Sequence, residues 1–98
     1  MQLLEQNIHT AKALVIDANA TTRSIMATQL RDLGVNQVRQ IGRVQDARLA
    51  LEGTTYDVVL CEMNFDGGPM SGQDLLDELR REHLLPFSTI FILVTGEA

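Results

Sequence analysis

The sequence contains few residues of several types, and each shortage excludes some classes of protein. Among its 98 residues there is one cysteine, Cys61, which excludes an internal disulfide and a cysteine-rich metal site and is typical of the reducing cytosol. No apolar run approaches the roughly 20 residues that a transmembrane helix requires. The start, MQLLEQNIHT, has no basic region, apolar run or small-residue cleavage site, so we expect no secretory signal.

Basic residues are also scarce. Eight of them stand against thirteen acidic residues, which gives a net charge of -5. This charge repels phosphate backbones and anionic membrane surfaces, so we expect no direct nucleic-acid partner and no membrane partner. The hydrophobic fraction of 45% and the absence of repeats or linker-like tracts indicate a single globular domain. We expect a cytoplasmic protein.

Short apolar runs alternate with helical patterns along the chain. The pattern predicts strands over 11–16, 37–41, 57–61 and 89–94, and helices over 21–33, 44–51 and 73–82. Strands that alternate with helices indicate right-handed crossovers and a parallel sheet. The helix residues expected to face inward are Ile25, Met26, Leu30, Leu33, Ala47, Ala50, Leu51, Leu75, Leu76 and Leu79.

Polar residues follow three of these strands directly. In open parallel sheets the functional crevice lies at the carboxyl ends of the strands, so any site is expected there. The residues in those places are Asp17, Ala18, Asn19, Glu62, Met63, Asn64, Thr95 and Gly96.

Four segments, in this order and spacing, resemble the response-regulator receiver domain of two-component signalling. They are LVID with Arg23 in the following helix, YDVVLCEMN, SGQDLLDELR and ILVTGEA. The resemblance implies an α/β, flavodoxin-like, doubly wound parallel sheet with strand order 2-1-3-4. It covers an incomplete receiver domain over residues 11–98, after an N-terminal preface over residues 1–10.

The resemblance also implies a site. Receivers accept a phosphoryl group from a histidine kinase or phosphotransfer domain onto an aspartate after the third strand, and Glu62 occupies that phosphoacceptor position here. Thr95 matches the hydroxyl that binds the phosphoryl group and acts as a switch. Asp17 matches one acid of the magnesium site, and Asn64 stands where the family supplies a backbone carbonyl ligand.

Two substitutions depart from the family pattern. Ala18 replaces the second acid, usually a direct Mg²⁺ ligand, and Glu62 replaces the acceptor aspartate. Pocket carboxylates fall from about three to two, so a Mg²⁺ site is possible but weakened. Glutamate also extends one methylene further than aspartate, which misplaces a phosphoryl group relative to Thr95. We therefore expect a receiver, not an enzyme, that accepts phosphoryl groups weakly or not at all. Asp66, in a glycine-flanked loop, is a minor alternative acceptor.

The chain stops after the fourth strand, whereas the family continues with a fourth helix, a fifth strand and a fifth helix. We expect a longer natural protein with an output domain on the C-terminal side. The missing elements would leave Phe91, Leu93 and a strand edge uncovered, so we expect this fragment to self-associate.

Simpler interpretations stand beside these. Asp17 could cap a helix, Thr95 could merely end a strand, and Cys61 is most simply a core thiol. His9 and His83 have no partner at ligand spacing, and Gly67-Gly68 lacks a phosphate-loop framework. A small flavodoxin-like cofactor carrier or enzyme fragment is the rival function. Against it, the loop after the first strand has no glycine, and the single tyrosine, Tyr56, lies before the third strand.

Overall fold

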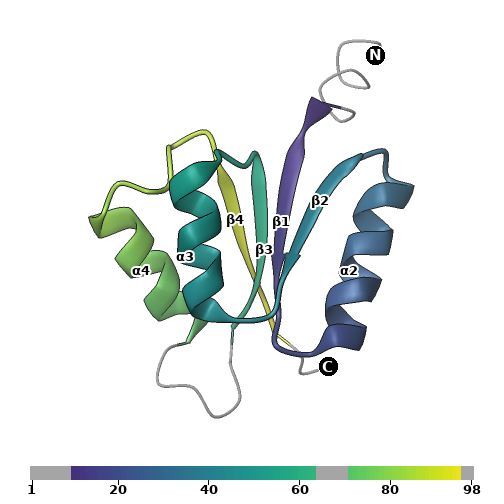
Figure 1. The fold of residues 1–98 in the computed structure, drawn as a ribbon, viewed down its shortest axis with the longest axis horizontal. Helices are drawn as coiled ribbons and strands as arrows, with labels where there is room; N and C mark the ends of the chain where they lie inside the picture. The colour runs from purple at the N-terminus through teal and green to yellow at the C-terminus, as the bar shows by residue number, and fades with distance from the viewer. Residues whose placement is uncertain (1–9, 64–70, 96–98) are drawn as a thin grey trace.

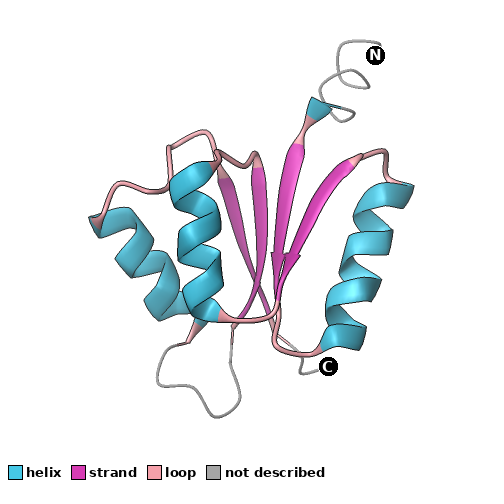
Figure 2. Ribbon diagram, viewed as in Figure 1, coloured by secondary structure: helices cyan, strands magenta, loops and turns pink. Residues whose placement is uncertain are grey.

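The computed structural model describes residues 10–63 and 71–95, which form four strands and three helices (Figures 1 and 2). Their order is β1 (Lys12–Ile16), α2 (Ala20–Asp32), β2 (Gln37–Ile41), α3 (Val44–Gly53), β3 (Val58–Glu62), α4 (Gly72–Arg81) and β4 (Ile90–Val94). These bounds lie within one residue of the expected ones, except at the end of α3, which extends two residues further. The proposed preface lies almost entirely outside the described residues.

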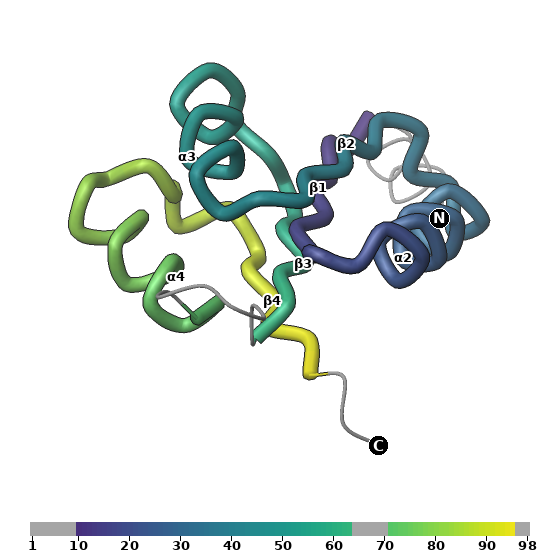
Figure 3. Tube along the Cα trace, turned by 60° about the horizontal axis from the view of Figure 1, so that its bottom comes forward, coloured from purple at the N-terminus to yellow at the C-terminus, as the bar shows by residue number. Residues whose placement is uncertain are grey.

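The strands form one parallel sheet in the order β2-β1-β3-β4, which confirms the predicted topology. One helix, α2, covers one face of the sheet, and α3 and α4 cover the other (Figures 1 and 3). Because all strands run the same way, their carboxyl ends share one edge. That edge carries the residues after β1, β3 and β4.

The main core lies between the sheet and the helices α3 and α4. Alternate residues of β1 and β3 point into it and are completely buried, as the two-residue period of a strand requires: Leu14, Ile16, Val59 and Cys61. Helix α3 contributes Ala47, Ala50 and Leu51, and helix α4 contributes Leu75 and Leu79. These helix residues confirm the expected inward stripes, while Leu76 of α4 is only half-buried.

An arginine on α3 joins that helix to α4. Arg48 donates to Glu52 of its own helix at 3.3 Å, to Glu78 of α4 at 3.1 Å and to Glu82 at 2.5 Å. The hydrogen bond that Arg48 donates to Glu52 and the charges of Glu82 and Glu78 raise the pKa of the Arg48 guanidinium. The cluster is exposed, so its main effect is to orient the two helices.

The inward face of α2 differs from the prediction. Met26 and Ala27 are buried on it, whereas Ile25 is 53% exposed and Leu33 is 72% exposed. Helix α2 packs against β1 and β2, and its buried stripe follows positions 23, 26, 27 and 30. Ile25 is turned about 100° from Met26 and falls outside this stripe.

The exposed face of β4 also differs from the prediction. Phe91 and Leu93, expected to be uncovered, pack against the main core, because they pair with Val59 and Cys61 on the side of α3 and α4. The exposed residues are Ile90 at 60% and Ile92 at 43%. They point to the opposite face, where α2 packs mainly on β1 and β2.

A capping box starts α4 close to the end of β3. The Ser71 hydroxyl accepts the Asp74 N–H at 3.1 Å, and the Asp74 carboxylate accepts the Ser71 N–H at 3.0 Å, which lowers the pKa of Asp74. Gly72 then lies against the β3 terminus, since a Cβ there would be 2.2 Å from the Glu62 carbonyl oxygen. Only glycine permits this approach.

Within the two described stretches, no helix combines the length and apolar character needed to cross a membrane.

We predict different costs for two leucine truncations, one within α4 and one at the C-cap of α2. Leu79→Ala removes a completely buried side chain and should lower the free energy of unfolding by about 3 kcal/mol. Leu33→Ala, at a site that is 72% exposed, should change it by less than about 0.5 kcal/mol. Urea denaturation measures both. Equal losses would contradict the observed packing of α2.

We also predict opposite effects for two glycine substitutions in helices. Gly72→Ala forces a methyl group onto the Glu62 carbonyl and should destabilise the fold by at least about 2 kcal/mol. Gly53→Ala meets no atom within 4 Å and should be neutral or stabilise by up to about 1 kcal/mol. Thermal unfolding tests the pair. A harmless Gly72→Ala would mean that α4 does not start against β3.

Candidate functional site

The site residues predicted from the sequence fall at the shared carboxyl edge of the sheet. Asp17 follows β1, Glu62 is the last residue of β3, and Thr95 follows β4. Ile16 pairs with Cys61, and Glu62 pairs with Val94, so the three positions lie on adjacent strands of known register. Asn64 and the alternative acceptor Asp66 lie outside the described residues.

Asp17 is buried, with 4% of its surface exposed, and backbone bonds fix its position. Its N–H donates to the Ile41 carbonyl at 3.1 Å, and its Oδ1 accepts the Asn19 N–H at 2.8 Å. The cap of α2 is Asn19, whose Oδ1 accepts the Thr22 N–H at 2.9 Å. The N-cap interpretation of Asp17 is therefore wrong, because Asp17 holds the turn that leads to the cap.

Arg23 fixes the same turn from the first turns of α2. Its Nη1 donates to the Asp17 carbonyl oxygen at 2.6 Å. Gly42, just after β2, makes room for the guanidinium, since a Cβ there would lie 2.9 Å from Nη1. The sequence drew attention to Arg23, but the pairing with Gly42 depends on β1 and β2 being neighbours.

Glu62 reaches across from β3 to the turn after β1. The Ala18 N–H donates to Glu62 Oε2 at 3.2 Å, and the side chain of Glu62 is half-buried. The longer side chain thus brings its carboxylate to the backbone of the residue that replaces the second acid. This contact could not be read from the sequence, because it joins residues 44 positions apart.

The pKa of Cys61, a residue of the core, depends on its burial and on the charges at this edge. Burial, followed by the negative charges of Glu62 and then Asp17, raises the pKa of Cys61 to about 12. The thiol donates to the Glu62 carbonyl at 3.4 Å. A thiol with so high a pKa carries almost no thiolate at neutral pH, so Cys61 is a core residue and not a nucleophile.

Thr95 extends the edge on the far side of Glu62. The Met63 N–H donates to the Val94 carbonyl at 2.8 Å, which carries the pairing of β3 and β4 past the last residues of both strands. Thr95 follows directly and is exposed. Thr95 therefore stands at the same rim of the sheet as Glu62.

The described part of this edge provides carboxylates of the kind that Mg²⁺ prefers, but few of them. Asp17 and Glu62 supply two, and Ala18 supplies no side-chain oxygen. Within residues 10–63 and 71–95, no group of three or more His, Cys, Asp or Glu side chains could hold a metal ion. The donor type fits Mg²⁺, whereas the number of protein ligands is low.

Comparison with known proteins is consistent with this arrangement. The family model of the response regulator receiver domain matches residues 13–98. The chain is 32% identical over 87 residues to chemotaxis protein CheY-3 of Vibrio cholerae, which covers 89% of this chain and 65% of that protein. The chain thus spans just under two thirds of the length of this relative.

Solved structures show the same fold. The receiver domain of the histidine kinase CKI1 from Arabidopsis thaliana, complexed with Mg²⁺ and BeF₃⁻, has a TM-score of 0.78 at 23% identity and covers 96% of this chain and 71% of that one. Chemotaxis response regulator CheY4 of Vibrio cholerae has a TM-score of 0.77 at 23% identity, with 90% and 70% covered. The chain belongs to the response regulator receiver domain family, whose members are signalling modules of two-component systems.

Proposed function

We propose that this receiver domain signals through protein–protein contacts and accepts phosphoryl groups weakly or not at all. The observation that carries the proposal is the hydrogen bond from the Ala18 N–H to Glu62 Oε2. It ties the carboxylate at the acceptor position to the turn after β1. The two departures from the family pattern, Ala18 and Glu62, therefore act together.

Phosphoryl acceptance needs a carboxylate oxygen that can attack phosphorus while the donor imidazole leaves. At Glu62, Oε2 accepts the Ala18 N–H, which holds the carboxylate against the turn after β1 and lowers the nucleophilicity of that oxygen. The extra methylene also moves the product acyl phosphate relative to Thr95, and a misplacement near 1 Å costs about a hundredfold in rate. A fixed negative charge at Glu62 instead partly imitates the phosphorylated state.

Magnesium binding is expected to be weak for the same reason. Asp17 and the backbone carbonyl of Asn64 would hold the ion, which supplies positive charge next to the carboxylates. Asp17 Oδ1 already accepts the Asn19 N–H, and Ala18 offers no replacement ligand. A receiver domain of similar fold, that of the histidine kinase CKI1, was solved in complex with Mg²⁺ and BeF₃⁻.

The partners follow from the family. We propose contact with a histidine kinase or phosphotransfer domain and with an output domain on the C-terminal side of this segment. The net charge of -5 disfavours nucleic acid and membranes as direct partners, and the single cysteine favours the cytoplasm.

The rival function of a flavodoxin-like cofactor carrier or enzyme gains no support from the site. The turn after β1 contains no glycine to admit a phosphate group. Tyr56 is buried before β3, at the opposite end of that strand from Glu62, and cannot stack on a ligand at the carboxyl edge.

We predict that the full-length protein gains no phosphoryl mass with Mg²⁺ and a small-molecule phosphodonor, because Glu62 is misplaced and a Mg²⁺ ligand is missing. Ala18→Asp combined with Glu62→Asp should restore acceptance, while Glu62→Asp alone should restore little. Intact mass spectrometry measures all three. A gain of mass in the parent protein, mapped to Glu62 or Asp66, would overturn the proposal.

Self-association of the 98-residue chain is a second proposal, supported by the unequal edges of the sheet. The β2 edge is polar and exposes Arg39, whereas β4 reads IFILV and exposes Ile90 and Ile92. In the described structure β4 pairs only with β3, so its other edge can pair with a second copy.

We predict that Ile92→Lys shifts this chain from dimer to monomer, because the charge would lie in the buried contact. Leu49→Lys, on α3 and 65% exposed, is the matched control and should leave the assembly unchanged. Sedimentation velocity measures the molar mass. A monomeric parent chain, or equal effects of both variants, would contradict the contact along β4.

A further inference from the structure

Two helices of this chain end in the same hydrogen-bonding pattern but with different residues. At the end of α2, the Gly34 N–H donates to the Arg31 carbonyl at 2.9 Å, and the Val35 N–H donates to the Leu30 carbonyl at 3.0 Å. At the end of α4, the His83 N–H donates to the Arg80 carbonyl at 3.2 Å, and the Leu84 N–H donates to the Leu79 carbonyl at 2.9 Å. Both are Schellman motifs.

The motif requires a left-handed backbone at its central residue. Gly34 has φ of 106° and His83 has φ of 57°, and His83 is the only described non-glycine residue with a positive φ. A side chain is disfavoured in this conformation, which is why glycine usually occupies it. The exposed imidazole adds nothing to the core, so glycine at this position would give a more stable fold. A strained residue that the fold does not need points to another use.

A cavity of about 410 Å³ adjoins His83. Its apolar part is formed by Leu85, Pro86 and Phe87, and the Phe87 ring is fully exposed. Thr89 fixes the base of the cavity, since its hydroxyl donates to the Tyr56 carbonyl at 2.6 Å. The remaining lining residues are Arg80 and His83. A guanidinium group, an imidazole and an exposed aromatic ring therefore meet at one surface.

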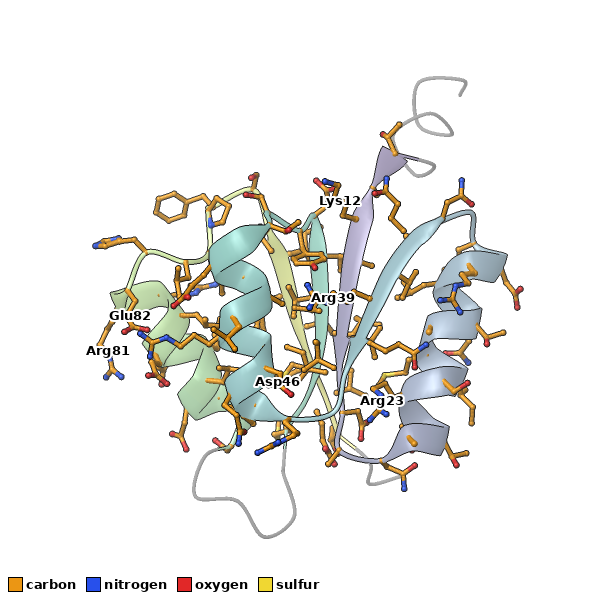
Figure 4. All side chains as sticks on the ribbon, in the orientation of Figure 1. Lys12, Arg23, Arg39, Asp46, Arg81 and Glu82 are labelled. Atoms are coloured by element: carbon orange, nitrogen blue, oxygen red, sulfur yellow. The ribbon has the colours of Figure 1, made fainter. Side chains whose placement is uncertain are left out.

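The acidic side chains of α4 bond to residues other than those that line the cavity. The glutamates of this part of α4, Glu78 and Glu82, both accept from Arg48 on the side of α3, and Asp77 accepts from Gln73. No ion pair is formed by Arg80, Arg81 or His83 within the described stretches. Figure 4 shows Arg81 at the outer side of α4, pointing away from the sheet. The lining of the cavity thus carries one formal charge, that of Arg80, and includes no acidic residue.

We propose that Arg80, His83 and Phe87 form a docking site for an acidic segment of a partner protein that carries an apolar side chain. Arg80 and the imidazole N–H bind its carboxylates, and Phe87 with Pro86 packs against its apolar residue. The site lies before the amino end of β4, whereas Thr95 follows the carboxyl end. It is therefore separate from the acceptor site and does not depend on the chemistry of Glu62.

The binding test uses NMR titration of the ¹⁵N-labelled full-length protein with two capped peptides. One has aspartates and glutamates around a central phenylalanine, and the other has lysines in place of the acidic residues. We expect amide shifts confined to residues 80–89 with the acidic peptide alone. Equal shifts with both peptides, or shifts elsewhere on the fold, would overturn the proposal.

Substitutions separate docking from folding. His83→Gly should raise the melting temperature by about 2–5 °C, because it relieves the left-handed backbone, and weaken acidic-peptide binding about three- to tenfold. Arg80→Gln should weaken binding similarly. Arg31→Gln is the matched control, since Arg31 holds the equivalent position at the end of α2. An unchanged affinity of His83→Gly, or a lowered melting temperature, would refute the proposed role of His83.

Discussion

The parallel pairing of β3 with β1 on one side and β4 on the other is the constraint on which the rest of this structure depends. It brings residues from distant parts of the sequence to one edge of the sheet, and it buries alternate residues of β1 and β3 against α3 and α4. Glu62 meets the turn after β1 only because of this register. The same pairing decides that Phe91 and Leu93 face the core while Ile90 and Ile92 do not.

The hydrogen bond between Ala18 and Glu62 links the two departures from the family pattern. Taken separately, Ala18 removes a metal ligand and Glu62 lengthens an acceptor. In the structure the longer side chain binds the backbone of the residue that lost its carboxylate. Burial raises the pKa of Cys61 to about 12, and the negative charges of Glu62 and Asp17 add to this shift. The edge therefore keeps two carboxylates, one fewer than the family pattern supplies.

The two faces of the sheet are covered unequally. Helices α3 and α4 are joined by Arg48 and enclose the main core, whereas α2 covers β1 and β2 alone. This asymmetry explains the exposure of Ile90 and Ile92. Glu78 and Glu82 at the end of α4 bond to Arg48 on the side of α3, whereas Arg80 and His83 line the cavity.

The sequence by itself determined the element order, the parallel sheet and the edge where Asp17, Glu62 and Thr95 lie, because these follow from local periodicity and from the direction of parallel strands. It could not determine which flank of α2 is buried, since Ile25 and Met26 are both apolar and only the neighbouring strands distinguish them. It could not determine the partners of Arg23, Gly42 and Gly72 or the left-handed backbone of His83. Those features depend on distances between segments far apart in the chain, and only the tertiary structure sets these distances.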